Sequence, residues 1–218
     1  MDASAANGKF GTLLLDPASW TIKDGDGTNT ANVVYEEQLE NQLADIELVA
    51  DDFIYMEDLK GKGDNELSVG EKNITFETTG ADSYIEFEDK SDSIVTTTGN
   101  VFMKAGGGGI DIGNIETGSP NPHVPSGTIE LFTSNEGAIS TGHLKALGGS
   151  KASILVVASG DLKISGDNSN GAVWAKTHNT GSNFADSAIA EICLQSIYGS
   201  IEIDHFVEAW SHGKTETI

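Results

Sequence analysis

Apolar and polar residues alternate in short pieces along most of the chain. Each piece is three to five residues long and places apolar residues on either side of a polar one, as in Ile46–Leu48, Ile74–Phe76 and Ile201–Ile203. Successive side chains of a strand point to opposite faces, so this pattern predicts short strands with one buried face. Clusters of Gly, Asn, Asp and Ser separate the pieces and predict turns. The pattern therefore predicts an all-β protein.

The spacing of the pieces favours a solenoid. Ile54, Ile74 and Ile94 lie twenty residues apart, and the pieces between them begin every seven to eleven residues. A three-residue strand is unstable alone, but strands stacked on equivalent strands form a continuous parallel sheet. Repetition of strand units at a period near twenty predicts a parallel β-helix. The alternative is a β-sandwich, whose strands are usually longer and joined by hairpin turns.

The two ends of the chain depart from this rhythm. Residues 33–44 show a partial helical stripe, so residues 1–44 are expected to form an N-terminal cap or lead-in strand with one short helix. Residues 45–170 are expected to form regular coils. Residues 171–218, which contain Trp174 and Trp210, are expected to form less regular terminal coils or a cap within the same continuous domain.

The composition is strongly acidic. The 218 residues include 34 acidic and 12 basic residues, which give a net charge of −22, and every basic residue is Lys. Nucleic acid is excluded as an expected partner, because binding its phosphates requires clustered positive charge. The absence of Arg also argues against bidentate clamping of carboxylates or phosphates. Acidic surfaces keep exposed sheets soluble and attract divalent cations.

Other residue types add little to the functional picture. Cys193 is the only cysteine, so no intrachain disulfide is expected, and its place in an apolar piece predicts a buried side chain. No apolar run is long enough to span a membrane, and membrane insertion is not expected. Because the N-terminus lacks the features of a signal peptide, an exported parent protein would imply an excised segment with an added start Met.

The N-terminal third carries two motifs of a known family. Residues 11–17 read GTLLLDP and are followed by Trp20-Thr21-Ile22, and Leu39 and Leu43 then lead into residues 46–50. This order resembles the filamentous-haemagglutinin-type exoproteins of two-partner secretion. The unit Lys72-Asn73-Ile74-Thr75-Phe76 is similar to their recurring G-N-I-T-L repeat. The secretion-domain motifs N-P-N-G-I and N-P-N-L are missing, so the likeness is to a segment outside that domain.

The resemblance implies a right-handed parallel β-helix that crosses the bacterial outer membrane and is secreted or displayed on the cell surface. It implies an outer-membrane transporter as partner during export. It further implies attachment to a host, cell-surface or matrix glycan or protein. The family's commonest role, adhesion, is thus the expected function.

Two alternatives stay open, and the first is a polysaccharide-active enzyme. Pectin-degrading lyases use Arg or Lys as the base, and hydrolases need several convergent Asp residues. Asp51-Asp52 is the only Asp pair, and an acidic pair beside a strand is usually a solvated turn. No catalytic residue is therefore assigned.

The second alternative is a Ca²⁺-stabilised structural module. Asp24 and Asp26 offer oxygen ligands but lack the remaining spacing of an EF-hand loop. Asp111 lies in GGGGIDIG, which resembles one copy of the Ca²⁺-binding nonapeptide repeat. These three are the candidate metal ligands, and no cofactor other than Ca²⁺ is expected. None of the five His residues shows the spacing of a metal site, and each is expected in an isolated surface or turn position.

Overall fold

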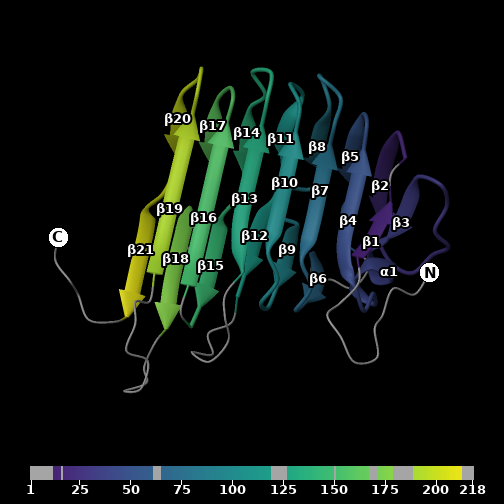
Figure 1. Cartoon of the computed structure of the whole chain (residues 1–218), viewed down its shortest axis with the longest axis horizontal. Helices are drawn as coiled ribbons and strands as arrows, with labels where there is room; N and C mark the ends of the chain where they lie inside the picture. Colours follow the sequence, from purple (N-terminus) through teal and green to yellow (C-terminus); the bar gives the residue numbers. More distant parts are fainter. Residues whose placement is uncertain are drawn as a thin grey trace.

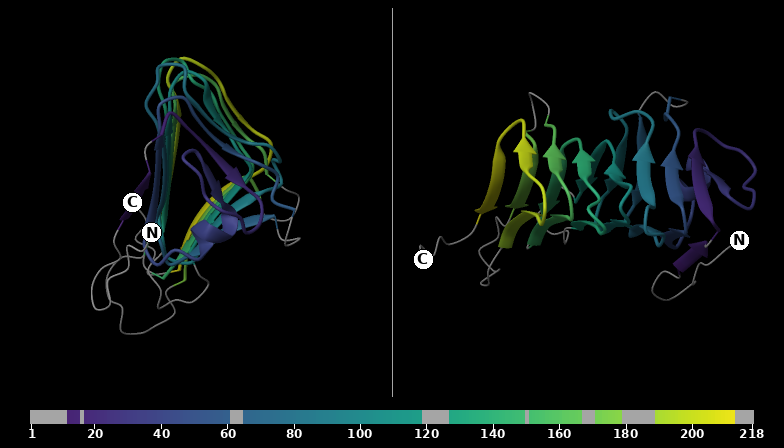
Figure 2. Two further views of the ribbon diagram at one scale, coloured as in Figure 1. Left: turned by 90° about the vertical axis from the view of Figure 1, so that its right-hand side faces the viewer. Right: turned by 90° about the horizontal axis from the view of Figure 1, so that it is seen from above.

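The computed structural model describes residues 12–15, 17–60, 65–118, 127–149, 151–166, 171–178 and 189–212. The described chain consists of short parallel strands and one short helix, which wind into a rod (Figure 1). The first strands lie at one end of the rod and the last at the other. Viewed along the rod, the coils superpose as a three-sided outline (Figure 2). The expected parallel β-helix is confirmed.

Each side of the rod is one parallel sheet. Sheet A contains β1 (Thr12–Leu15), β4 (Asp45–Ala50), β7 (Ile74–Thr78), β10 (Val101–Ala105), β13 (Thr128–Thr133), β16 (Lys151–Ala158) and β19 (Ile189–Ser196). Sheet B contains β3 (Val33–Tyr35), β2 (Ser19–Lys23), β5 (Phe53–Met56), β8 (Tyr84–Phe87), β11 (Gly109–Asp111), β14 (Ile139–Thr141), β17 (Leu162–Ile164) and β20 (Ile201–Ile203). Sheet C contains β6 (Glu66–Gly70), β9 (Ser93–Thr96), β12 (Asn114–Thr117), β15 (Leu144–Gly148), β18 (Val173–His178) and β21 (Val207–His212).

The coil is longer than the twenty residues expected from the sequence. Ile54, Ile74 and Ile94 lie in β5, β7 and β9, which belong to three different sheets. The strand partner of Ile54 in the next coil is Ile85, 31 residues later. The twenty-residue spacing therefore connects every second strand along the chain, whereas one coil contains three strands. The predicted coil length of about twenty residues is wrong.

The core is a set of inward rows, each made of equivalent residues in successive coils. In sheet A one row runs through Ile46, Ile74, Val101, Ile129 and Ile154, all at most 1% exposed. Burying a side chain of this size stabilises the folded state by about 1.5–3 kcal/mol relative to exposure. The stacked rows therefore supply the apolar burial that a single short strand lacks.

The N-terminal helix is shorter than expected. Residues 33–35 form β3, and α1 spans only Glu36–Glu40. Its N-cap residue, Tyr35, makes no side-chain capping hydrogen bond, and Leu39 is fully buried. Packing rather than helix propensity therefore stabilises this single turn.

Helix α1 lies beside β6, the first strand of sheet C. The Ser68 N–H donates to the Glu40 carboxylate (2.8 Å), and Lys72 Nζ donates to the carbonyls of Glu40 and Gln42 (2.7 Å each). An unpaired strand edge invites association with other chains. The helix partly covers this edge.

The C-terminal strands continue all three sheets, since β19, β20 and β21 pair with β16, β17 and β18. The inward residues of the last coil are less buried: Ile201 is 47% and Val207 is 44% exposed, whereas their partners Leu162 and Val173 are at most 1% exposed. The described segment has no helix with the length and apolar character needed to cross a bilayer.

Candidate functional site

Two tryptophans lie on the outer face of sheet C. Trp174 and Lys176 point outward from β18, and Trp210 points outward from β21 directly opposite Lys176. Lys176 Nζ lies 4.4 Å from the centroid of Trp210 and 5.5 Å from that of Trp174. Lys145 Nζ lies 6.0 Å from the Trp174 centroid. We call Lys145, Trp174, Lys176 and Trp210 the aromatic–lysine face. These tryptophans lie within paired strands that continue the coils.

A charged cluster adjoins this face in the neighbouring coils. The Glu116 carboxylate lies 2.8 Å from His143 Nε2 and accepts a hydrogen bond from Lys145 Nζ at 2.7 Å. The bond from His143, followed by the bond and charge of Lys145, lowers the pKa of Glu116 to about 2 despite partial burial. The Glu116 carboxylate therefore stays ionised and fixes the position of Lys145.

A ladder of polar side chains follows the corner between sheets C and A. Asn73 donates its N–H and side-chain amide to the Asp45 carboxylate (2.9 and 3.0 Å), and its own oxygen accepts the Asn100 N–H at 2.8 Å. Asn100 in turn accepts the N–H and hydroxyl of Thr128 at 2.8 and 3.0 Å. A groove of about 340 Å³ runs along this ladder. The ladder aligns successive coils through side chains as well as strands.

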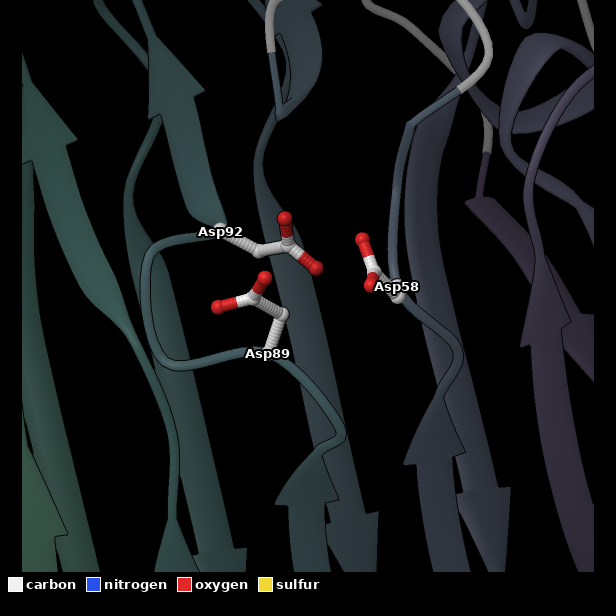
Figure 3. Close-up of side chains that lie close together, drawn as sticks. All are labelled: Asp58, Asp89 and Asp92. Atoms are coloured by element: carbon white, nitrogen blue, oxygen red, sulfur yellow. The ribbon is translucent and has the colours of Figure 1, made fainter.

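Three aspartates meet at the corner between sheets B and C. Asp58 follows β5, and Asp89 and Asp92 lie in the turn between β8 and β9 of the next coil (Figure 3). One carboxylate oxygen from each lies within 4.8 Å of the other two. We call Asp58, Asp89 and Asp92 the corner aspartates. Carboxylate oxygens are the preferred ligands of Ca²⁺.

The corner aspartates differ in their surroundings. Asp92 is 0% exposed, and its Oδ2 accepts the Leu59 N–H at 3.2 Å. Asp89 accepts the N–H and hydroxyl of Ser91 at 2.8 and 2.9 Å. Asp58 contacts Lys60, whose side chain is 74% exposed. Burial raises the pKa of Asp92 to about 6, and the negative charges of Asp89 and Asp58 add to this effect. The hydrogen bond from the Leu59 N–H opposes the rise.

The candidate ligands from the sequence lie elsewhere. Asp24 and Asp26 lie in the turn after β2, where Asp26 accepts a bond from Gln38 Nε2 at 2.6 Å. Asp111 ends β11, and its Oδ2 lies 2.9 Å from Lys90 Nζ. Among the residues that the structure describes, none of these three belongs to a group of three potential metal ligands.

The corner aspartates carry a signal that sequence reasoning missed. Asp58 and Asp89 are 31 residues apart, the same separation as the strand partners Ile54 and Ile85. With the assumed twenty-residue coil, they fall out of register. The correct coil length would have placed them side by side.

The Asp51-Asp52 pair, considered as a possible catalytic pair, lies at the corner between sheets A and B. Both residues are exposed, and the Asp51 carboxylate accepts the Thr79 hydroxyl at 2.8 Å. The pair therefore contributes to a solvated turn, as the sequence suggested.

Comparison with known proteins gives no match: no protein-family model, no curated protein and no solved structure resembles this chain closely enough. The motif of residues 11–17 is described only in part, with residues 12–15 forming β1 and residues 19–23, which follow it, forming β2.

Proposed function

We propose that this chain is a structural and adhesive β-helical segment of a secreted or bacterial cell-surface exoprotein. In this role it acts as a rigid rod whose sheet faces and loops contact a surface ligand. The parallel β-helix and the motif order around residues 11–50 support the proposal. Export through an outer-membrane transporter belongs to the same proposal and rests on the motif resemblance alone.

The aromatic–lysine face is the observation that carries the adhesive part. Trp210 is 39% exposed with Lys176 beside it, and Lys145 lies near the neighbouring Trp174, on a chain of net charge −22. An indole ring offers a flat apolar surface, and a Lys ammonium donates charge-assisted hydrogen bonds to a carboxylate. A glycan with acidic sugars has both complementary groups, an apolar ring face and a carboxylate. We therefore expect an acidic polysaccharide to bind here.

Binding of the full chain to an immobilised uronic-acid polysaccharide tests this function. We expect the Trp210→Ala and Lys176→Gln variants to bind at least about tenfold more weakly, because each removes one of the two complementary contacts. Phe102→Ala is the matched control, since Phe102 is an outward aromatic residue of sheet A. Equal binding by the Trp210 and Phe102 variants would refute the role of this face.

The enzyme alternative is weaker on geometric grounds. A carboxyl with a raised pKa suits a general acid, and Asp92 has such a pKa. However, a general acid must reach the glycosidic oxygen of its substrate, and Asp92 is 0% exposed. Incubation of the chain with acidic polysaccharides, followed by an assay for new reducing ends or unsaturated products, tests this alternative.

A further inference from the structure

The corner aspartates have the dimensions of a Ca²⁺ site. Ca²⁺ binds oxygen ligands at about 2.3–2.6 Å, so two ligands on opposite sides of the ion lie roughly 5 Å apart. The three carboxylate oxygens lie within 4.8 Å of one another, so all three can contact a common ion. Figure 3 shows the Asp92 carboxyl pointing into the space between Asp89 and Asp58.

Asp92 supplies an independent indication of a missing partner. Its side chain is completely buried, and Oδ1 makes no hydrogen bond within the described residues, although Leu59 satisfies Oδ2. Leaving a buried carboxylate oxygen unpaired is unfavourable, and buried charges are normally paired or coordinate metals. Asp58 Oδ1 is likewise buried and unpaired in the part of the chain that the structure describes.

Neighbouring residues hold two of the three carboxylates in place. The Ser91 N–H and hydroxyl orient Asp89, and the Leu59 N–H orients Asp92. Such outer contacts position ligands in metal sites. Lys60 contacts Asp58, but its side chain is mostly exposed and can turn towards solvent when an ion binds.

We propose that Asp58, Asp89 and Asp92 bind one Ca²⁺ ion that joins two successive coils of the β-helix. Asp58 belongs to the corner of one coil, and the other two ligands belong to the corner of the next. Ca²⁺ fits better than Mg²⁺, because it tolerates irregular geometry and longer ligand distances. Water completes the coordination shell. This site is independent of the aromatic–lysine face, which lies on the outer surface of sheet C near its last strands.

Calorimetric titration of the chelator-treated full chain with CaCl₂ tests the proposal. Sufficient KCl, about 0.15 M, screens diffuse attraction to the acidic surface. We expect one Ca²⁺ per chain with a dissociation constant at or below about 1 mM. The Asp92→Asn variant should bind at least about tenfold more weakly, because the isosteric amide removes a charge while its oxygen can still accept the Leu59 N–H.

Asp51→Asn is the matched control, because Asp51 is an exposed aspartate at the corner between sheets A and B, away from the corner aspartates. It should leave the affinity unchanged. Lys60→Ala should strengthen binding, because it removes the cation that competes for Asp58. Absence of saturable binding to the unmodified chain, or an equal loss of affinity in the Asp92 and Asp51 variants, would overturn the proposal.

Thermal unfolding gives a second readout that also detects a folding defect. With EDTA at neutral pH, Asp92→Asn should raise the melting temperature, because it replaces a buried carboxylate that lies beside the like charges of Asp58 and Asp89. Addition of Ca²⁺ should raise the melting temperature of the unmodified chain and leave that of the variant nearly unchanged. A variant that is less stable in EDTA and still responds to Ca²⁺ would contradict the site.

Discussion

At the scale of single residues, the negatively charged Glu116 contacts the aromatic–lysine face through Lys145. Its two carboxylate oxygens contact His143 and Lys145, and Lys145 in turn lies near the ring of Trp174. In the register of sheet C, Glu116, Lys145 and Trp174 occupy one outward row in successive coils. Loss of the carboxylate would therefore free Lys145 and alter the electrostatics of the adjoining face.

The first prediction concerns the pH dependence of this contact. Because the folded state lowers the pKa of Glu116 from 4.5 to about 2, the contact stabilises the fold above pH 4.5 and is lost as the pH falls towards 2. The facing groups are His143 and Lys145. We expect Glu116→Gln to lower the free energy of unfolding by about 1–3 kcal/mol at pH 7, and by much less near pH 2.

Urea unfolding of both proteins across this pH range measures the difference. Glu130→Gln is a suitable control, because Glu130 is an outward carboxylate of sheet A, away from the Glu116 contact in sheet C. A constant difference between pH 7 and pH 2 would show that Glu116 acts through packing rather than charge.

Two residue predictions from the sequence are wrong, one wholly and one in part, for different reasons. Cys193 is exposed rather than buried, because Ile192 and Leu194 occupy the inward positions of β19 and the residue between them faces outward. His143 lies in the turn between β14 and β15, one of the two expected positions, but it is not isolated, since it is 8% exposed and in contact with Glu116. The alternation of side chains along β19 determines that Cys193 faces outward. The environment of His143 depends on a contact between coils that the sequence does not display.

At the scale of elements, apolar alternation located most strands but missed those with small or polar inward residues. β12, β14 and β15 each carry only one large inward residue, and their other inward positions include Thr117, Thr141 and Ala146. A buried threonine hydroxyl needs a partner, and Thr141 donates to the carbonyl of Gly113 at 2.9 Å. Buried threonines fit the interior because a neighbouring turn supplies a carbonyl acceptor for the hydroxyl. The sequence of one strand does not show where that acceptor lies.

The coil length also varies too much to be read from one spacing. Ile94 pairs with Ile115 after 21 residues, whereas Leu162 pairs with Ile201 after 39. The turns at the three corners accommodate different loop lengths while the strands keep their register. Fold class was therefore accessible from strand pattern, but the alignment of coils, and with it the corner aspartates, was not.

The second prediction concerns the contact between α1 and sheet C. Lys72 is 9% exposed, burial lowers the pKa of its ammonium group, and it donates to two carbonyls at the end of α1. We expect Lys72→Met to lower the free energy of unfolding by about 1–3 kcal/mol, because two charge-assisted bonds to partly buried carbonyls are lost. Hydrogen exchange should also become faster in α1 and β6.

Lys104→Met provides the matched control for this element. Lys104 is 50% exposed and forms a surface ion pair with Glu77 at 2.7 Å. Surface ion pairs contribute about 0–1 kcal/mol, so little change is expected. Similar exchange in α1 for both variants would show that Lys72 does not hold the helix against the strand edge.

At the scale of the whole molecule, stability is a sum of contacts between neighbouring coils. Each coil packs mainly on the coils before and after it, as in other solenoids, although Asn135 Nδ2 donates to the Ala81 carbonyl two coils away at 3.1 Å. The corner aspartates and the Asn73–Asn100 ladder both join neighbouring coils, so each acts locally on the rod. A substitution should therefore have an effect that depends on its place along the axis.

The third prediction compares two positions of one inward row in sheet B. Ile139 and Ile201 both pair with Leu162, but Ile139 is 0% exposed and Ile201 in the last coil is 47% exposed. Ile139→Ala should lower the free energy of unfolding by about 2–5 kcal/mol, because it leaves a cavity between two coils. Ile201→Ala should cost under about 1 kcal/mol, because solvent already reaches half of the side chain. Chemical unfolding measures both at several protein concentrations. Equal losses for the two variants would contradict the view that Ile201 is exposed to solvent in the last coil. If these losses also depended on protein concentration, they would show that another molecule covers the last coil.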